Sequence, residues 1–335
     1  MAKLVHAKAD AAPTHSRGQV TSEVAAVLID AMSKCDTPWQ KPWSARAMCA
    51  VNGATGHAYR GINRILLGLS AREDPRWMTY QQAQAKGWQV KKGEKGIGIV
   101  KVIDLGGPSD EPDRQEGGGG DARTGVEQDA SVVSRPKAWT LRRYTVFNAE
   151  QIKGPPELEA PLLNFEPVAR AEAVIEALKE KTGLVVRHGG SQAYYAPSMD
   201  EVHLPVKSSF DTAYEYHAVA LHEGAHSTLA AHRLNRREAI AQRWGDEAYA
   251  VEELRAEICS AILAAETGVP ISQAHIVNHA AYLNSWIKAI KRDPMALFSA
   301  AKDAEKMADY MLGLEKQSTA VAEHAEWVAD YDRHR

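Results

Sequence analysis

Two histidines four residues apart, with a glutamate between them, are the strongest chemical signal in the chain: Leu221-His222-Glu223-Gly224-Ala225-His226. The preceding residues 210–220 contain neither Pro nor Gly and predict a helix. Residues four apart lie on one face of a helix, so the imidazoles of His222 and His226 can be directed at one metal ion. Glu223 follows directly, and its carboxylate could take the proton of an attacking water. The pattern predicts a catalytic zinc centre with Glu223 as the general base; the alternative is a helix whose histidines are incidental.

A catalytic zinc ion needs a third protein ligand and keeps one position open. We expect no third histidine of the metzincin type and do not count His232 as a ligand. The helix predicted over 247–266 offers carboxylates four residues apart at Glu253 and Glu257. We expect Glu253 to bind the metal and Glu257 to hydrogen-bond a ligand histidine from behind, with the reverse assignment as the alternative. Glu252 is expected at the surface, and the expected ion is Zn²⁺, with another divalent ion such as Mn²⁺ as the alternative.

A second pattern, in the N-terminal half, is the interleaving of aromatic and cationic residues. Single-stranded nucleic acid is held by this combination, because bases stack on aromatic rings while cations contact phosphates. Recognition of duplex DNA would need a helix with polar base-reading residues, and the sequence predicts no such helix. For any one aromatic residue, a place in the core is the alternative. The candidate DNA contacts are Trp39, Lys41, Trp43, Tyr59, Arg60, Asn63, Trp77, Lys91, Lys92, Lys95, Arg142 and Arg143.

The formal net charge of −3 hides opposite charges in different parts of the chain. Residues 21–104 and 135–153 carry net charges of +5 and +4, whereas residues 105–134 and 154–335 carry −5 and −9. A basic N-terminal half fits a polyanionic partner, and a solvated basic surface is the alternative.

The composition, 44% hydrophobic and 25% charged over 335 residues, is that of a globular protein long enough for two domains. No run of 18 apolar residues is present, so we expect no membrane-spanning helix. The three cysteines, Cys35, Cys49 and Cys259, show no CxxC spacing and are expected to be reduced thiols.

The order of predicted elements indicates an α+β protein of two domains. Segments 98–103 and 138–147 predict strands that flank an acidic, Gly-rich loop over 105–134. Further elements are short strands near 184–187, 193–196 and 201–204 and helices over 168–182, 209–232, 247–266, 272–291 and 295–312. The predicted division is a disordered leader over 1–20, an N-terminal domain over 21–153, a Pro-rich linker over 154–166, a mainly helical domain with a small sheet over 167–313, and a C-terminal tail over 314–335.

Several of these segments also carry a family resemblance. In the N-terminal half they are Thr37–Trp43, Asn52–Gly56, Tyr59–Asn63, Trp77–Thr79, Val90–Gly96 and Val146–Asn148. In the C-terminal half they are Tyr194–Pro205, His222–Thr228, Arg233–Arg236, Glu252–Glu257 and Tyr282–Trp286. Together they resemble the ArdC-type antirestriction proteins of conjugative plasmids and other mobile elements. The acidic segment 105–134 is longer than the family needs, and Ser227-Thr228 departs from the aromatic residue followed by Thr that the family leads us to expect.

The resemblance implies an α+β single-stranded-DNA-binding domain, of the kind shared with TraC-type primases, followed by a zincin-like metallopeptidase domain. It further implies a plasmid-associated antirestriction protein that protects incoming DNA from host restriction. Such a protein would act in the bacterial cytoplasm and, on transfer, in the recipient cell. Two alternatives stay open. One is a DNA-recruited zinc protease that cleaves DNA-bound protein, and the other is a single-stranded-DNA-binding protein whose metal is purely structural.

Overall fold

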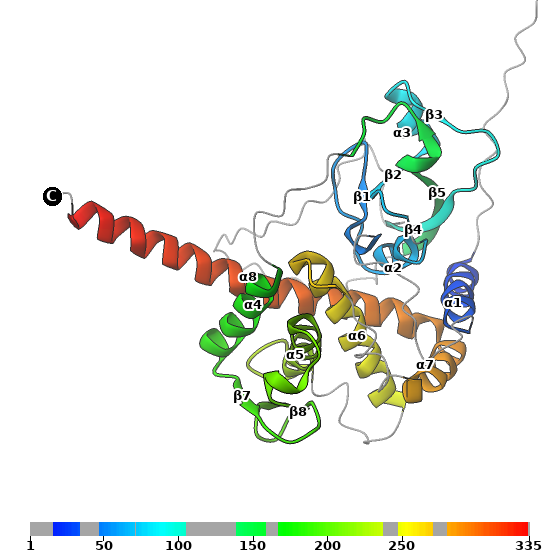
Figure 1. Ribbon diagram of the computed structural model, residues 1–335. Helices are drawn as coiled ribbons and strands as arrows, with labels where there is room; N and C mark the ends of the chain where they lie inside the picture. The colour runs from blue at the N-terminus through cyan, green and yellow to red at the C-terminus, as the bar shows by residue number, and fades with distance from the viewer. Residues whose placement is uncertain are drawn as a thin grey trace, which may run out of the picture.

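The computed structural model describes residues 16–33, 47–70, 72–104, 139–158, 167–236, 247–270 and 280–333. Its elements form a sheet-containing N-terminal domain and a mainly helical C-terminal domain with a small sheet, which confirms the predicted α+β class (Figure 1). The predicted acidic loop over 105–134 and most of the predicted linker lie outside the described residues.

The N-terminal domain is built on a four-stranded sheet in the order β1-β2-β5-β4. These strands are β1 (Val51–Asn52), β2 (Arg76–Thr79), β4 (Ile97–Asp104) and β5 (Trp139–Asn148). β-branched and aromatic residues dominate β4 and β5, and such residues favour extended backbone. The two strands pair antiparallel from Ile97 opposite Val146 to Asp104 opposite Trp139, close to the predicted strands at 98–103 and 138–147.

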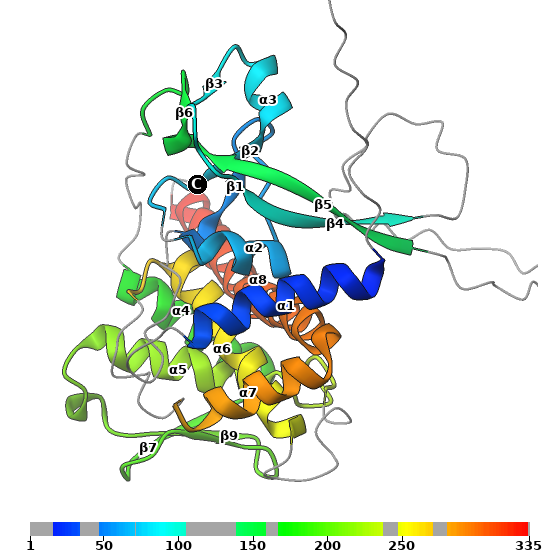
Figure 2. The ribbon, with the colours of Figure 1, turned by 90° about the vertical axis from the view of Figure 1, so that its right-hand side faces the viewer.

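Helices cover this sheet unevenly. α1 (Arg17–Ser33) and α2 (Ile62–Gly68) lie along the β4–β5 pair, whereas α3 (Tyr80–Ala85) lies at the other end with the short strands β3 (Gln89–Val90) and β6 (Ile152–Lys153) (Figure 2). α3 begins at a capping box in which Thr79 and Gln82 each bond the other's backbone amide. α1 begins inside the segment predicted as a leader over 1–20, because its apolar residue Val20 is fully buried.

The C-terminal domain opens with α4 (Pro167–Thr182) and a three-stranded sheet in the order β7-β9-β8. These strands are β7 (Val185–His188), β8 (Tyr194–Ala196) and β9 (Glu201–Leu204), and the helices that follow are α5 (Ala213–Ser227), α6 (Glu247–Thr267), α7 (Ala280–Arg292) and α8 (Pro294–Arg333). α5 is shorter than the predicted 209–232. Thr212 caps its first turn by accepting from the Glu215 amide, and the chain turns away after Ser227.

α8 is one helix of 40 residues that crosses the molecule and continues to the C-terminal end (Figure 1). The helix predicted over 295–312 was therefore too short, and the predicted tail over 314–335 is helical as far as Arg333. The physical reason is composition: after Gly313 the segment contains neither Pro nor Gly and is rich in Ala and Glu, which have high helix propensity.

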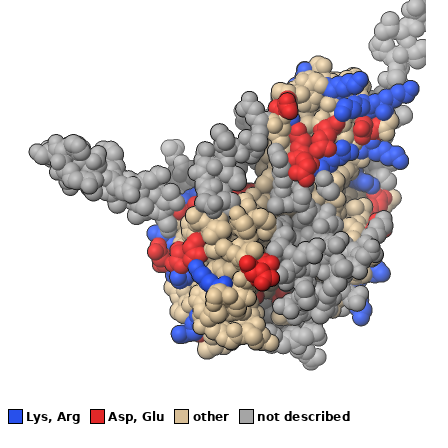
Figure 3. All heavy atoms as spheres, in the orientation of Figure 1, with Lys and Arg blue, Asp and Glu red and all other residues tan. Residues whose placement is uncertain are grey.

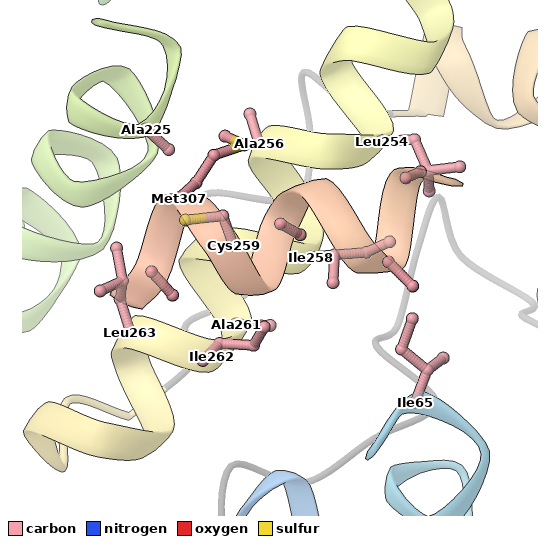
Figure 4. Close-up of a cluster of buried hydrophobic side chains, with 14 of the residues drawn as sticks. Ile65, Ala225, Leu254, Ala256, Ile258, Cys259, Ala261, Ile262, Leu263 and Met307 are labelled. Atoms are coloured by element: carbon pink, nitrogen blue, oxygen red, sulfur yellow. The ribbon is translucent and has the colours of Figure 1, made fainter. Parts of the chain in front are cut away.

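One hydrophobic core joins the two domains. It contains Leu28 of α1 and Ile65 of α2 together with Leu254 of α6 and Met307 of α8. Figure 4 shows Ile65 beside the buried side chains of α6 and α8. The N-terminal helices and α8 thus bury apolar surface against each other, and the two domains form a single packed body.

A buried ionic cluster reinforces this interface. Arg64, 5% exposed, places its Nε 2.9 Å from Glu305 Oε1 on α8 and its Nη1 3.2 Å from Glu266 Oε1. Glu305 Oε1 also accepts from the Gly61 amide at 2.9 Å. Arg60 lies 3.1 Å from Glu305 Oε2 and pairs with Asp309 as well. The segment 60–64 is therefore tied to α8 by charge as well as by packing.

Candidate metal centre and nucleic-acid surface

α5 presents the histidine pair to the interior. His222, Glu223 and His226 are 3%, 8% and 9% exposed, so the chemistry-bearing face of this helix points into the domain. Gly224, between them, lies against α8: a Cβ there would be 3.2 Å from Met311 Cε. A glycine in a helix interior costs about 1 kcal/mol relative to Ala, and here it allows close approach of α8.

α6 places Glu253 opposite the two histidines. The two Nε2 atoms of His222 and His226 lie 3.2 Å apart. Glu253 Oε2 is 3.7 Å from His222 Nε2, and Oε1 is 3.5 Å from His226 Nε2. Tetrahedral ligands at about 2.0 Å from a zinc ion are about 3.3 Å from one another. The three donors therefore already stand at about the separations that a shared ion requires.

Each ligand histidine has a carboxylate behind it. Glu257, fully buried, lies with its Oε2 3.6 Å from His222 Nδ1. Glu252 Oε1 lies 3.6 Å from His226 Nδ1. A carboxylate at Nδ1 fixes the ring and leaves Nε2 directed at the metal position. The structure thus brings Glu253 and Glu257 to the places that the sequence predicted for them, although their roles stay predictions.

The expectation for Glu252 was wrong. This residue is 2% exposed, and its oxygens accept from Arg236 at 2.7 and 3.1 Å. Burial by itself would raise the pKa of Glu252, but His226 and Arg236 outweigh it and lower the pKa, so the carboxylate is ionised. Arg255, one turn along α6, lies 3.6 Å from Glu252 as well, but such i, i+3 pairs are typical of exposed helix faces, so the sequence held no local signal for this burial.

Electrostatics show that the site favours a cation. Burial lowers the pKa of His222, but Glu253 and Glu257 outweigh that effect and raise the pKa to about 9. Glu253 has a strongly lowered pKa despite its burial, because both histidines face it. Four buried glutamates around two imidazoles form an anionic pocket, and a divalent ion would relieve their repulsion.

Glu223 lies in the same pocket, but its pKa is raised whereas that of Glu253 is lowered. Burial is the largest influence and raises its pKa, with a smaller contribution from Glu253, whereas the two histidines and a hydrogen bond from the Tyr195 amide lower it. The net result is a carboxyl group whose pKa is raised, as expected of a group that exchanges protons. Tyr195 lies in β8, so this edge strand of the small sheet runs beside Glu223.

His232 lies outside the metal pocket. Its spacing from His226 does match the third histidine of HExxHxxGxxH, with Leu229 in place of Gly, so spacing alone does not exclude a metzincin. The structure argues against a metzincin-type third ligand, because His232 is more than half exposed and its Nε2 lies 3.4 Å from Asp200. Among the described residues, the group that could hold a metal is His222, His226 and Glu253.

Of the candidate DNA contacts, some lie outside the described residues, some are buried or paired within the protein, and some are exposed. Trp39, Lys41 and Trp43 lie outside the described residues. Trp77 is 1% exposed and packs in a cluster with Leu67 and Val146, so its assignment as a DNA contact was wrong. Its place on β2, paired on one side with β1 and on the other with β5, buries the indole in the core, where no base could stack on it.

Other candidates have structural contacts. The Asn63 side chain donates to Val100 O at 2.7 Å and accepts from Val100 N at 2.9 Å, which fastens α2 to β4. The Tyr59 hydroxyl donates to Trp77 O at 3.4 Å, and burial raises its pKa to about 12. Arg60 belongs to the ionic cluster on α8, and Arg143 pairs with Glu23 of α1 at 2.5 Å.

The remaining candidates are exposed cations. Lys91, Lys92 and Lys95 lie in the turn that joins β3 to β4, and Arg142 lies on β5. Lys91 donates to Glu150 O at 2.6 Å, which leaves its charge uncompensated. On the face shown in Figure 3, Lys and Arg side chains gather at the upper right, over α3 and this turn. Phosphate contact is therefore open to these four residues.

Two family models match the chain. Residues 18–147 match the N-terminal domain of the anti-restriction factor ArdC, and residues 173–303 match a zincin-like metallopeptidase. A zincin-like domain implies zinc as its metal. In the described part of the chain, no helix combines the length and the apolar character needed to cross a membrane.

Among curated proteins, two Escherichia coli proteins named DNA primase TraC are 42% and 40% identical over 300 and 302 residues. Each alignment covers 88% of this chain but only 27% and 20% of the primases, so the chain spans about a quarter of their length. An uncharacterized protein of Sinorhizobium fredii is 37% identical, and the alignment covers 89% of this chain and 92% of that protein.

Among solved structures, two crystal structures of the antirestriction ArdC protein from the R388 plasmid match this chain. Its metal-free structure gives a TM-score of 0.67 at 31% identity and covers 89% of this chain and 98% of that one. Its Mn(II)-bound structure gives 0.64 at 30% identity, with 88% and 98% covered. That relative therefore binds a divalent ion other than zinc, which supports Mn²⁺ as an alternative metal.

Proposed function

The chain belongs to the family of ArdC antirestriction proteins, and on that premise we propose that it binds the single-stranded DNA of an incoming mobile element and protects it from host restriction. The N-terminal domain would hold the DNA, and the C-terminal domain would supply a metal-dependent peptidase site. We place this activity in the bacterial cytoplasm, including that of the recipient cell. The observation that carries the proposal is that both domains of the family are present in one packed body.

The peptidase part rests on the pocket between α5 and α6. His222, His226 and Glu253 would hold the ion, with Glu257 and Glu252 orienting the two imidazoles. A bound zinc or manganese ion would polarise a peptide carbonyl and make water a stronger acid. Glu223 would take the proton of the attacking water and pass it to the leaving amine, for which a raised pKa is suited.

The edge strand β8 would position a substrate. It pairs with β9 in the described sheet, and the Tyr195 amide points at Glu223. An extended peptide laid along such an edge is held by main-chain hydrogen bonds, which brings one of its carbonyls close to the general base. The substrate class that this geometry supports is an extended polypeptide segment.

The number of ligands favours catalysis over a purely structural metal. Structural zinc sites are closed by four protein ligands, whereas catalytic sites use three and keep one position open. The described residues offer three, with Glu223 beside them. A DNA-recruited protease that cuts DNA-bound protein is a second candidate, favoured by the shared core that holds the peptidase domain against the DNA-binding domain.

A transfer experiment tests the proposal. The mobile element would be moved into restricting and non-restricting recipients with the gene intact, deleted, or carrying Glu223→Ala. We expect deletion to lower transfer only into the restricting recipient. Equal transfer into both recipients would contradict the antirestriction function, and the Glu223→Ala result separates a role for hydrolysis from one for binding alone.

A further inference from the structure

A small cationic lobe projects from the end of the N-terminal sheet. It comprises residues 80–96 and 149–153, which include α3, β3 and β6, and we call it the lysine lobe. It has a small core in which Ala83 and Ile152 pack on Met78 of β2, with Trp88 against them. Five lysines stand exposed on it: Lys86, Lys91, Lys92, Lys95 and Lys153.

The two carboxylates of the lobe do not neutralise these lysines. Glu150 accepts from Arg72 at 3.0 Å and from the amides of Glu73 and Asp74 at 2.9 and 3.1 Å. Burial would raise the pKa of Glu150, but these contacts lower it overall. Glu94 accepts from Gln151 at 2.8 Å. Glu150 fastens the lobe to the segment before β2, and Glu94 bonds within the lobe, so neither carboxylate pairs with its lysines.

Several lysine ammonium groups of the lobe are free to contact a ligand. Among the described residues, Lys92, Lys95 and Lys153 form no ion pair. Other basic residues of the domain are already engaged: Arg64 is buried against Glu305, Arg60 pairs with Asp309, and Arg143 pairs with Glu23. In the described part of the N-terminal domain, the exposed cations without an ion pair therefore lie mostly on the lobe, with Arg142 on β5 outside it. Figure 3 shows Lys and Arg side chains at the upper right, with Asp and Glu side chains among them.

The lobe also offers aromatic surface. Tyr80, the first residue of α3, is 41% exposed, and its hydroxyl accepts from Gln84 and Gln89 at 3.4 Å. Trp88 is half-buried, with the Lys86 ammonium 5.4 Å from its ring centroid. A Cβ at Gly154 would be 2.5 Å from Trp88 Cδ1, so the indole packs closely against the backbone of Gly154. Tyr80 is the ring with surface left for a base.

We propose that the lysine lobe is the surface that binds single-stranded DNA, with phosphates on Lys92, Lys95 and Lys153 and a base stacked on Tyr80. This inference rests on the proposed function and adds Tyr80 and Lys153 to the candidate DNA contacts named from the sequence. A single strand can turn a base toward an exposed ring, whereas a duplex keeps its bases stacked inside. The lobe therefore selects single strands by stacking and gains affinity from counterion release.

The test is a titration of the full chain with a fluorescent oligo-dT strand and a matched duplex at several salt concentrations. The variant Lys92→Ala/Lys95→Ala/Lys153→Ala is compared with Lys291→Ala/Lys302→Ala/Lys306→Ala, which removes three exposed lysines from α7 and α8. Single strands contribute a slope of about −0.7 per phosphate contact to log affinity against log salt. We expect the lobe variant to flatten this slope by about 2 and to weaken binding at least tenfold at about 50 mM salt.

A second pair of variants tests stacking. Tyr80→Ala should weaken oligo-dT binding about fivefold or more and leave duplex binding unchanged, whereas Tyr80→Phe should keep the affinity. If the lysine variant and its α7–α8 control lose affinity equally, or if duplex binds as tightly as oligo-dT, the lobe is not the selective surface and the inference fails. Absence of oligo-dT binding by the unmodified chain would instead refute the proposed function itself.

Discussion

At the scale of single residues, a carboxylate at the Nδ1 atom of each ligand histidine distinguishes the metal pocket. Glu257 faces His222 Nδ1 and Glu252 faces His226 Nδ1, both at 3.6 Å. Each carboxylate fixes the orientation of one imidazole and raises its basicity, and Arg236 in turn holds Glu252. Arg236, in the segment that follows α5, therefore supports the metal site although it touches neither histidine in the contacts described above.

We predict that Glu252→Gln lowers the affinity for Zn²⁺ or Mn²⁺ about 10- to 100-fold, because His226 loses the charge that orients it. Competition with a metal-binding chromophore measures this affinity. Glu180→Gln, an exposed change on α4, is the matched control and should leave the affinity unchanged. An unaltered affinity in Glu252→Gln would remove Glu252 from the metal site.

Glu223→Ala separates binding from chemistry. We expect it to keep the metal and oligo-dT affinities, because neither the three-residue ligand set nor the lysine lobe includes Glu223. Any peptide hydrolysis by the unmodified chain should be lost. Metal content by mass spectrometry and cleavage of an unfolded polypeptide give the two readouts, and loss of metal would show that Glu223 is itself a ligand.

At the scale of elements, the site depends on how closely α8 approaches α5. Gly224 allows this contact, since a Cβ there would lie 3.2 Å from Met311, whereas a Cβ at Gly313 on α8 would meet nothing within 4 Å. The two glycines are therefore a matched pair that differs in steric surroundings.

We predict that Gly224→Val lowers the free energy of unfolding of the metal-free protein by about 1–3 kcal/mol through overpacking. Gly313→Val should be close to neutral, because Val and Gly differ little in helix propensity and the site is open. Urea unfolding of both variants measures the difference, and equal stabilities would contradict the close contact of α5 with α8.

Local patterns predicted most elements, and long-range contacts explain the failures. Helical periodicity and breaker residues located α4 and α6, and β-branched runs located β4, β5, β7, β8 and β9, whereas no element was predicted before residue 98. The spacing of histidines and glutamates indicated which residues meet in the pocket. Sequence spacing could not show that Glu252 meets Arg236 or that Trp77 is enclosed by neighbouring strands. Both facts depend on how separate segments pack, which no local pattern encodes.

At the scale of the whole molecule, the two domains act as one body. They share a core, and Arg64 and Glu305 form a buried ion pair across their interface. Helix α8 contacts α1 and α2 of the N-terminal domain and α4, α5 and α6 of the zincin-like domain. Removing one domain would expose apolar surface on the other, so neither is expected to keep its full stability alone.

We predict that Glu305→Ala lowers the free energy of unfolding by about 3 kcal/mol or more, because it leaves Arg64 as a buried, incompletely paired charge. Asp309→Ala, which removes an exposed partner of Arg60, should cost less than about 1 kcal/mol. Calorimetry should show one unfolding transition for the unmodified chain. Two separate transitions, with only one moved by Glu305→Ala, would contradict a shared body.

We propose above all that three protein residues, His222, His226 and Glu253, hold a catalytic ion beside Glu223. X-ray absorption spectroscopy of the zinc-loaded full chain, recorded with and without oligo-dT, tests it most directly. We expect two imidazoles, one carboxylate and one ligand from outside the protein, and we expect His222→Ala to lose this coordination. Four protein ligands, or a zinc environment unchanged by Glu253→Ala, would contradict it.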